Sequence, residues 1–344
     1  METIEIKNIN GDVLFSHTAE DNTITLTVEA AVSCGVSLAN ANLAGACLAV
    51  ADLEGANLEG ANLKGAIFRE ANLRDTNLRD TNLEKADLAW ADLAWANLAW
   101  AHLERAHLER AELKFAFLKC ADLDEAGLEE ANLDGAYLDR ASLVRANLKS
   151  ACLDNADLRR ADFESADLVL AKLRCAKLFG AKLVGANIYG ADLNGAYLDR
   201  ANLEGVDLRN AVLNGEDLVG ANIYGANLNG AKNIPFIPLS CPSEGAFTAW
   251  KKVNNEYLVK IQIPEDARRC SATTRKCRCD KAMVLDITSL DGNKHYDEVT
   301  NNRYNETIYK VGEFVYPDSF DENRWNECSH GIHFFVNKQD AINY

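Results

Sequence analysis

The residues whose types could do metal chemistry gather near the C-terminal end of the chain. Cysteine thiolates and histidine imidazoles are the ligands that zinc prefers, and the candidates are Cys277, Cys279, Cys328, His330 and His333. The stretches "CRC" and "CSHGIH" lack the Cys-x-x-Cys spacing of zinc knuckles, so the alternative is that these thiols are simply buried or exposed. We therefore expect no metal and no cofactor, with these five residues as the ligand candidates if a metal binds.

The same part of the chain concentrates positive charge, although the whole protein has a net charge of -16. The basic cluster consists of Arg268, Arg269, Arg275, Lys276, Arg278 and Lys281. Such a cluster could hold a phosphate or another anion; the alternative is a solvated loop that balances nearby acids. No Ser/His/Asp arrangement, phosphate-cradling glycine loop or paired-carboxylate pattern is identifiable. We therefore expect that the chain is not an enzyme.

Short apolar segments separated by turn sequences must position these groups. The segments "AFTAWKKV", "EYLVKIQI", "KAMVLDITSL", "IYKVGEFVY" and "GIHFFV" favour strands, and "NN", "DGN" and "PDSFDEN" separate them. The tail "KQDAINY" favours a final helical turn. Residues 235–344 are therefore predicted to form a small, mainly β (α+β) domain. Pro235, Pro238 and Pro242 end any regular ladder that precedes it.

A five-residue repeat runs without insertion from Val36 to Gly230, as in "ADLAWADLAWANLAW". Its central residue is Leu, Ile or Phe, the residue two before is almost always Ala, and the other positions carry most of the charge. Two apolar residues spaced by two point to one face of an extended segment. The next apolar residue comes three later, so the chain must turn a corner between repeats. Extended sides joined by corners predict a closed coil that stacks on itself.

Repeats of the form Ala-(Asp/Asn)-Leu-x-x resemble those of the pentapeptide-repeat proteins. The resemblance implies that residues 36–234 form a right-handed, four-sided parallel β-helix, a mainly β solenoid of nearly ten coils with four repeats per coil. The C-terminal stretches "IPEDARRCSATTRKCRC", "YKVGE" and "ECSHGIHFF" resemble an uncharacterised domain often found behind such repeats, including in phage-like proteins. That second resemblance implies no known activity.

A solenoid needs its open end covered, and residues 1–35 are predicted to do so as a β-hairpin plus a short helix. Asn10-Gly11 is a hairpin turn signal, and a helix ending near Gly35 would carry a stripe of four apolar residues, Leu26, Val28, Ala31 and Val32. At the other end, Glu216 is the only charged residue at an inward alanine position. We expect a widened corner there, or a contact with the C-terminal domain.

Outward residues of the repeats suggest two surfaces. Exposed aromatic side chains often mark contact sites, and the predicted interaction residues are Trp90, Trp95, Trp100, Phe117, Tyr137 and Tyr197; the alternative for the tryptophans is recent duplication of "LAW". The second surface is an acidic belt in which no base interrupts the acids. It comprises Asp122, Asp124, Glu125, Glu129, Glu130 and Asp134.

The composition of the chain limits the classes of function that we expect. The acidic balance argues against direct nucleic-acid binding, no apolar run approaches the length of a membrane span, and scattered cysteines suit a reducing compartment, so we expect a cytoplasmic protein. The repeat region is predicted to be a rigid spacer or docking module that presents the C-terminal domain. Its expected partner is another protein or a second copy of the chain. One alternative is DNA mimicry at a type II topoisomerase such as gyrase, which the family resemblance suggests. Another is a C-terminal ligand-binding or catalytic domain.

Overall fold

The computed structural model describes residues 1–344 except 214–217, 219–220, 235–236, 238, 303–305 and 328. Contacts divide the chain into two compact units, Met1–Ile223 with Gly230–Pro235 and Tyr224–Asn229 with Phe236–Tyr344. Glu216 and Cys328 lie outside the described residues, so the expectations for them stay predictions. Among the described residues, no helix is long and apolar enough to cross a membrane.

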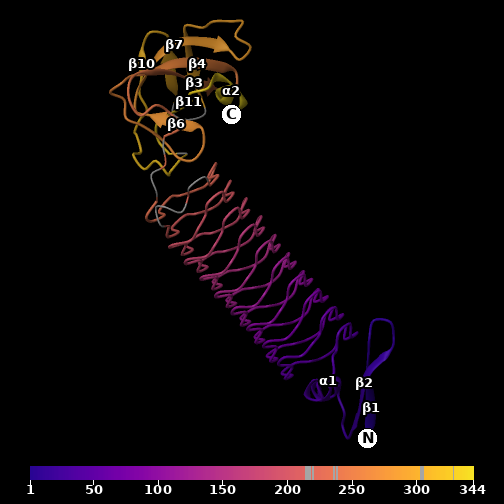
Figure 1. Ribbon diagram of the computed structural model, residues 1–344. Helices are drawn as coiled ribbons and strands as arrows, with labels where there is room; N and C mark the ends of the chain where they lie inside the picture. The colour runs from indigo at the N-terminus through magenta and orange to yellow at the C-terminus, as the bar shows by residue number, and fades with distance from the viewer. Residues whose placement is uncertain (214–217, 219–220, 235–236, 238, 303–305, 328) are drawn as a thin grey trace. The chain divides into compact units, whose positions relative to one another are not determined.

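The repeat region is a stack of coils in which the backbone pairs with itself every twenty residues (Figure 1). Parallel bridges join Asn42 to Asn62, Asn62 to Asn82, and so on to Asn202 and Asn222, and parallel series run along the other sides, one of them ending at Val212 and Lys232. Four five-residue repeats therefore make one coil. The central Leu and the Ala two residues before it are buried in nearly all described repeats, with exceptions such as Ala46, Ala221 and Ile223, which are half-buried. This confirms the inward positions read from the sequence.

The residue between the buried Ala and Leu is usually Asn or Asp because its side chain holds the corner. The side-chain oxygen of Asn72 accepts a hydrogen bond from the backbone N–H of Arg74 at 3.2 Å, and Asp92 does the same for Ala94 at 3.0 Å. This is the side-chain turn typical of these residues. The last residue of each repeat that the structure describes then adopts a positive φ, for example 61° at Val50.

Two repeats place a hydroxyl where most other repeats have alanine. Thr76 and Thr81 are fully buried, and their hydroxyls donate to the backbone carbonyls of Leu73 and Leu78, both at 2.6 Å. A buried hydroxyl with a hydrogen-bond partner avoids the cost of an unpaired polar group. The solenoid therefore accepts threonine at this position without a change in the coil.

The N-terminal residues form the predicted hairpin plus helix, from β1 (Glu2–Lys7), β2 (Val13–Ala19) and α1 (Ile24–Ser33). The hairpin pairs with the first coil: Asn42 N–H donates to the Lys7 carbonyl at 2.8 Å, and Ile9 N–H to the Asn40 carbonyl at 2.9 Å. Val28 and Ala31 of the predicted apolar stripe are buried, but the stripe does not extend to its first residue. Leu26 is exposed, whereas Thr27 is buried with its hydroxyl on the Asn22 side chain at 3.2 Å.

The C-terminal domain contains a seven-stranded antiparallel sheet with the order β10-β7-β4-β3-β11-β6-β5. Its described residues also form a two-stranded sheet, β8 with β9, and a short helix, α2. The bounds are β3 (Phe247–Val253), β4 (Tyr257–Ile263), β5 (Arg269–Ser271), β6 (Lys276–Cys279), β7 (Ala282–Ser289), β8 (Glu298–Asn301), β9 (Thr307–Lys310), β10 (Phe314–Val315), β11 (Ile332–Phe335) and α2 (Lys338–Asn343). Sequence patterns located β3, β4, β7, β9, β10 and β11 but missed β5, β6 and β8.

Candidate functional site

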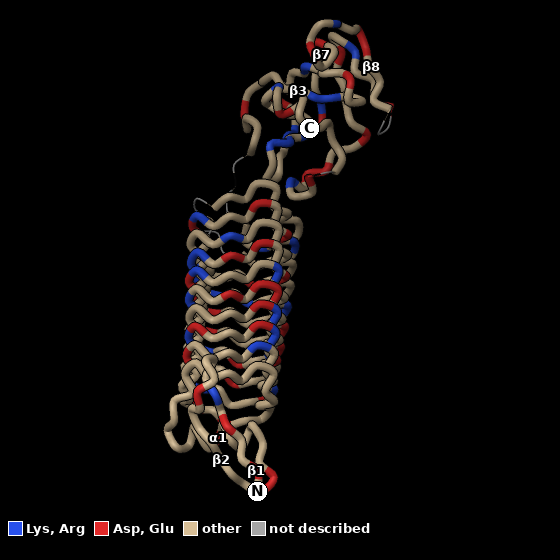
Figure 2. The backbone as a smooth tube through the Cα atoms, turned by 90° about the vertical axis from the view of Figure 1, so that its right-hand side faces the viewer, with Lys and Arg blue, Asp and Glu red and all other residues tan. Residues whose placement is uncertain are grey.

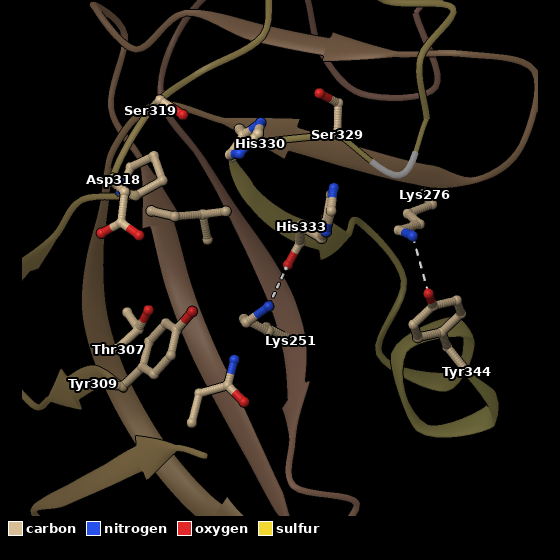
Figure 3. A pocket seen from close by; sticks show the side chains of 14 residues that line it. Lys251, Lys276, Thr307, Tyr309, Asp318, Ser319, Ser329, His330, His333 and Tyr344 are labelled. Carbon is tan, nitrogen blue, oxygen red and sulfur yellow. Dashed lines mark hydrogen bonds between the residues drawn. The ribbon is translucent and has the colours of Figure 1, made fainter. Parts of the chain in front are cut away.

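The C-terminal domain contains a cavity of about 480 Å³. It opens where β3 and β11 separate: these strands pair at a single position, Phe335 with Trp250. Figure 3 shows Lys251 and His333 next to each other in the centre of the lining. The cavity is also lined by Lys276, Tyr344, Tyr309, Thr307, Asp318, Ser319 and Ser329.

Lys251 reaches the cavity from the core-facing side of β3. Strand alternation places it on the same face as Ala249 and Val253, which are buried. Its Nζ donates to the His333 backbone carbonyl at 3.3 Å and lies 5.8 Å from the centre of the Tyr309 ring. No carboxylate within the described part of the chain forms an ion pair with it. Burial, and then the charge of Lys276, lower the pKa of Lys251 to about 8.

His333 contributes a neutral imidazole. Burial, reinforced by the positive charges of Lys276, Lys251 and Arg278, lowers the pKa of His333 to about 3, so the ring carries no charge at neutral pH. Its Nε2 atom is shielded from solvent and has no hydrogen-bond partner among the described residues. A buried polar atom without a partner is costly, and a bound ligand could supply the missing hydrogen bond.

Lys276 adds a second ammonium group to the lining. It is 7% exposed, donates to the Tyr344 hydroxyl at 2.9 Å and lies 4.9 Å from the centre of that ring. The hydroxyls of Thr307, Ser319 and Ser329 also line the cavity, and Asp318 adds one carboxylate. Ammonium and hydroxyl donors around a partly enclosed space are suited to hold a carboxylate or phosphate group.

The other members of the basic cluster are bound to partners within the domain. Lys281 pairs with Asp266, Arg275 with Asp340, and Arg268 with both Asp280 and Glu322. Arg269 donates to the carbonyls of Pro242, Gly245, Pro264 and Glu265, and Arg278, which is 3% exposed, donates to those of Asp321, Asn323 and Asn326. Of the six, only Lys276 lines the cavity.

The proposed metal ligands do not come together among the described residues. Cys277 and Cys279 are buried in β6. The hydrogen bond with the Cys241 thiol, and then burial, raise the pKa of Cys277, and burial raises the pKa of Cys279. The Sγ of Cys279 contacts the Ile332 carbonyl at 3.8 Å. His330 is exposed, and His333 faces Lys251 across the cavity lining. Within the described residues, three side chains that could together bind a metal ion lie in the repeat region instead. They are His102, Glu104 and Asp122.

The predicted aromatic residues of the repeat region are exposed, with Trp90 at 55%, Trp95 at 45% and Trp100 at 50%. Their neighbours come from the next coil. Arg110 covers the Trp90 ring at 4.8 Å, and Phe115 stacks on Trp95 at 4.6 Å. Phe117 and Tyr137 also stack, at 5.0 Å. Tyr197 is exposed but lies three coils from Tyr137, so it is not part of the same patch.

The expectation that no base meets the acidic belt is wrong. Arg105 pairs with Glu125 at 2.8 Å and Arg110 with Glu130 at 2.7 Å, each from the preceding coil. Asp124 accepts the Ser142 hydroxyl from the following coil. Figure 2 shows acidic and basic residues interleaved over successive coils. The belt therefore offers fewer uncompensated carboxylates than a mimic of the DNA backbone needs.

A family profile described as pentapeptide repeats matches most of the repeat region, and one described as a family of unknown function (DUF5758) matches residues 237–341. The repeat matches cover residues 51–89, 91–129, 121–160, 156–195, 176–215 and 196–232. No curated protein matches the chain.

Solved structures with similar repeats include HetL from the cyanobacterium Nostoc, described as involved in the regulation of heterocyst differentiation. It is 33% identical, with 60% of this chain and 94% of that chain aligned and a TM-score of 0.31. A protein of the Arabidopsis thaliana thylakoid lumen is 30% identical over 30% of this chain and 70% of its own, with a TM-score of 0.28. A third structure is a trypsin-treated form of QnrB1, described as a plasmid-mediated fluoroquinolone resistance protein. It is 22% identical, with 50% of this chain and 90% of that chain aligned and a TM-score of 0.28.

Proposed function

The chain belongs to the pentapeptide-repeat family and carries a C-terminal domain of the family of unknown function DUF5758, and on this premise we propose that it is a non-enzymatic scaffold presenting a ligand-binding domain. The repeat region is proposed to be a right-handed, four-sided β-helix that serves as a rigid spacer and docking module. The C-terminal domain is proposed to bind a small molecule through a carboxylate or phosphate group.

The observation that carries the proposal is the pairing of Lys251 with His333 at the cavity. Placing an ammonium group in a partly buried site is costly unless an anion compensates it, and the lowered pKa of Lys251 records that cost. The described partners of the ammonium group are a neutral carbonyl and an aromatic ring. A bound anion would compensate the charge, and a hydroxyl of the ligand could donate a hydrogen bond to His333 Nε2, because the neutral ring already donates to the Ser329 backbone from its other nitrogen.

Binding is favoured over catalysis by the arrangement of the serines. Ser319 and Ser329 both line the cavity, but no described hydrogen bond joins either hydroxyl to His330 or His333. A serine nucleophile needs such a base within hydrogen-bond reach. The convergent features of the site are instead positive charge and hydroxyl donors, which recognise a ligand without transforming it.

Titration of the full chain with inorganic phosphate, followed by calorimetry, tests the proposal. Lys251→Met keeps the length of the side chain and removes the charge, and we expect phosphate affinity to fall by more than about tenfold, the loss of one charge-assisted contact. The matched control is Lys252→Met. Lys252 is the next residue, and its Nζ also donates to a backbone carbonyl, that of Ile342 at 2.9 Å, but it does not line the cavity.

The stability of the two variants separates a lost binding site from a damaged fold. Because Lys251 is charged in an unfavourable environment, Lys251→Met should melt at the same temperature as the unmodified protein or higher. Equal phosphate affinity in the Lys251→Met and Lys252→Met proteins, or no saturable heat with any of the three, contradicts the proposed function.

A further inference from the structure

A second constellation, outside the cavity, lies on the surface of the repeat region. His102 and Asp122 occupy equivalent positions on consecutive coils and are joined by a parallel bridge. Glu104 lies two residues after His102, and the Nδ1 of His102 is 3.6 Å from the Glu104 Oε1. One ligand atom from each of the three side chains lies within 4.8 Å of the other two.

The three side chains leave ligand capacity unused. The Oδ1 of Asp122 accepts the backbone N–H of Asp124 at 3.1 Å, the corner hydrogen bond found throughout the repeats, so its second oxygen remains available. The Oε2 of Glu104 is shielded from solvent and has no hydrogen-bond partner among the described residues. Two carboxylates held this close repel each other, and a cation between them would remove the repulsion.

We propose that His102, Glu104 and Asp122 form a binding site for a divalent transition-metal ion that links two consecutive coils. One imidazole nitrogen and two carboxylate oxygens form a mixed set that suits zinc and its first-row neighbours, whereas calcium and magnesium prefer oxygen ligands alone. The observed 3.6 Å between the His102 and Glu104 atoms is close to the separation of about 3.4 Å between two tetrahedral ligands at zinc distances. Water would complete the coordination.

The chain contains an internal control, because the sequence "AHLER" occurs twice in succession. In the second copy, the Nδ1 of His107 lies 3.4 Å from the Glu109 Oε1, much as in the first. The residue on the next coil is Gly127 instead of an aspartate. A β-carbon at Gly127 would collide with the Glu109 carboxylate, which occupies that space. The two copies differ in the third ligand, and the proposal predicts that only the first copy binds metal.

Zinc titration of the full chain, with accessible thiols alkylated so that they do not compete, tests the site. We expect one zinc ion per chain, and an affinity reduced by more than about tenfold in Asp122→Asn and in His102→Ala. His107→Ala should bind zinc as the unmodified chain does. Asp122→Asn is the sharper change, because asparagine is a regular residue at this position of the repeat and preserves the corner hydrogen bond.

A second measurement uses the link between coils. Zinc should raise the melting temperature of the unmodified chain, since an ion that binds only the folded state stabilises it, and it should have no such effect on Asp122→Asn. Unchanged zinc affinity in both Asp122→Asn and His102→Ala, or an equal loss in His107→Ala, overturns the proposal.

Discussion

The Nζ of Lys251 lies 3.3 Å from the backbone carbonyl oxygen of His333, across the place where β3 and β11 stop pairing. The hydrogen bond is long and its acceptor is a neutral carbonyl group, so it compensates the ammonium charge only weakly. The same interaction keeps the ammonium group at the cavity lining, where its protonation decides the charge of the site.

Anion binding should therefore depend on pH through Lys251. Sulfate is a suitable probe because its charge stays constant over the range. With a pKa of about 8 in the free protein, Lys251 loses its charge as the pH rises, so sulfate affinity should fall by up to about tenfold per pH unit well above pH 8. Near pH 8, calorimetry in buffers of different ionisation enthalpy should show proton uptake on binding. Affinity that is constant through this range contradicts the role of Lys251.

His333 should make the C-terminal domain sensitive to acid. Its pKa is about 3 in the folded state, whereas the ordinary value of 6.5 applies in the unfolded state. Between pH 3 and pH 6.5 the unfolded state therefore binds a proton that the folded state does not. Stability should fall as the pH drops through this window, by up to about 1.4 kcal/mol per pH unit. His333→Gln should flatten that slope, measured by hydrogen exchange of peptides from β3 and β4. His330→Gln, a change at an exposed position, is the control and should retain the slope.

Substitutions at the two inward positions of the repeat should change the stability of the repeat region by different amounts. Leu123 is fully buried, and Leu123→Ala should cost about 2–5 kcal/mol because it leaves a cavity in the stack. Thr81→Ala restores the usual residue and removes one hydroxyl bond, that to the Leu78 carbonyl, so its effect should stay within about 1.5 kcal/mol. Urea unfolding followed by circular dichroism compares them. Equal losses would show that the leucine ladder is not the main source of stability.

The last residue of each repeat offers a test of backbone strain. Val50 has a φ of 61° and is exposed, a conformation that is unfavourable for a β-branched residue. Val50→Gly should stabilise the chain by about 1 kcal/mol. Gly45→Val is the reciprocal change at a φ of 67°, where an added β-carbon would meet nothing within 4 Å, and it should destabilise by a similar amount. Melting temperatures that move in the same direction for both changes contradict the strain argument.

The proposed docking role of the repeat region predicts that aromatic residues matter for association and not for folding. Trp100→Ser should leave the melting temperature unchanged, because the side chain is half exposed, and should weaken self-association in sedimentation experiments. Leu170→Ser, at the equivalent position of a repeat on another side of the coil, is an exposed apolar control. If both variants sediment like the unmodified chain, self-association through Trp100 is excluded.

Sequence patterns located the repeat core because each five-residue repeat carries its own inward Ala and Leu. Sequence patterns did not predict contacts between side chains of different coils. Arg105, for example, is twenty residues from Glu125 in the sequence but adjacent to it in the stack. The patterns failed also at β6, where "KCRC" reads as an exposed loop although Arg278 is buried among carbonyls. Lys251 left a signal, a lysine on the apolar face of a strand, but its approach to His333 depends on a strand order that sequence alone does not give.

The twenty-residue coil also limits how the chain can change in length. Deleting Ala106–Arg110, one copy of "AHLER", would turn all later repeats by one side of the coil. His102 would then face Gly127, and Asp122 would face Asn97, so the proposed ligands would separate although none of them had been removed. Loss of a whole coil, such as residues 141–160, would shorten the stack and leave the register of the remaining sides intact. Insertions and deletions of twenty residues, or of a multiple of twenty, therefore keep the sides of the remaining coils aligned. Insertions and deletions of any other length shift the sides relative to one another.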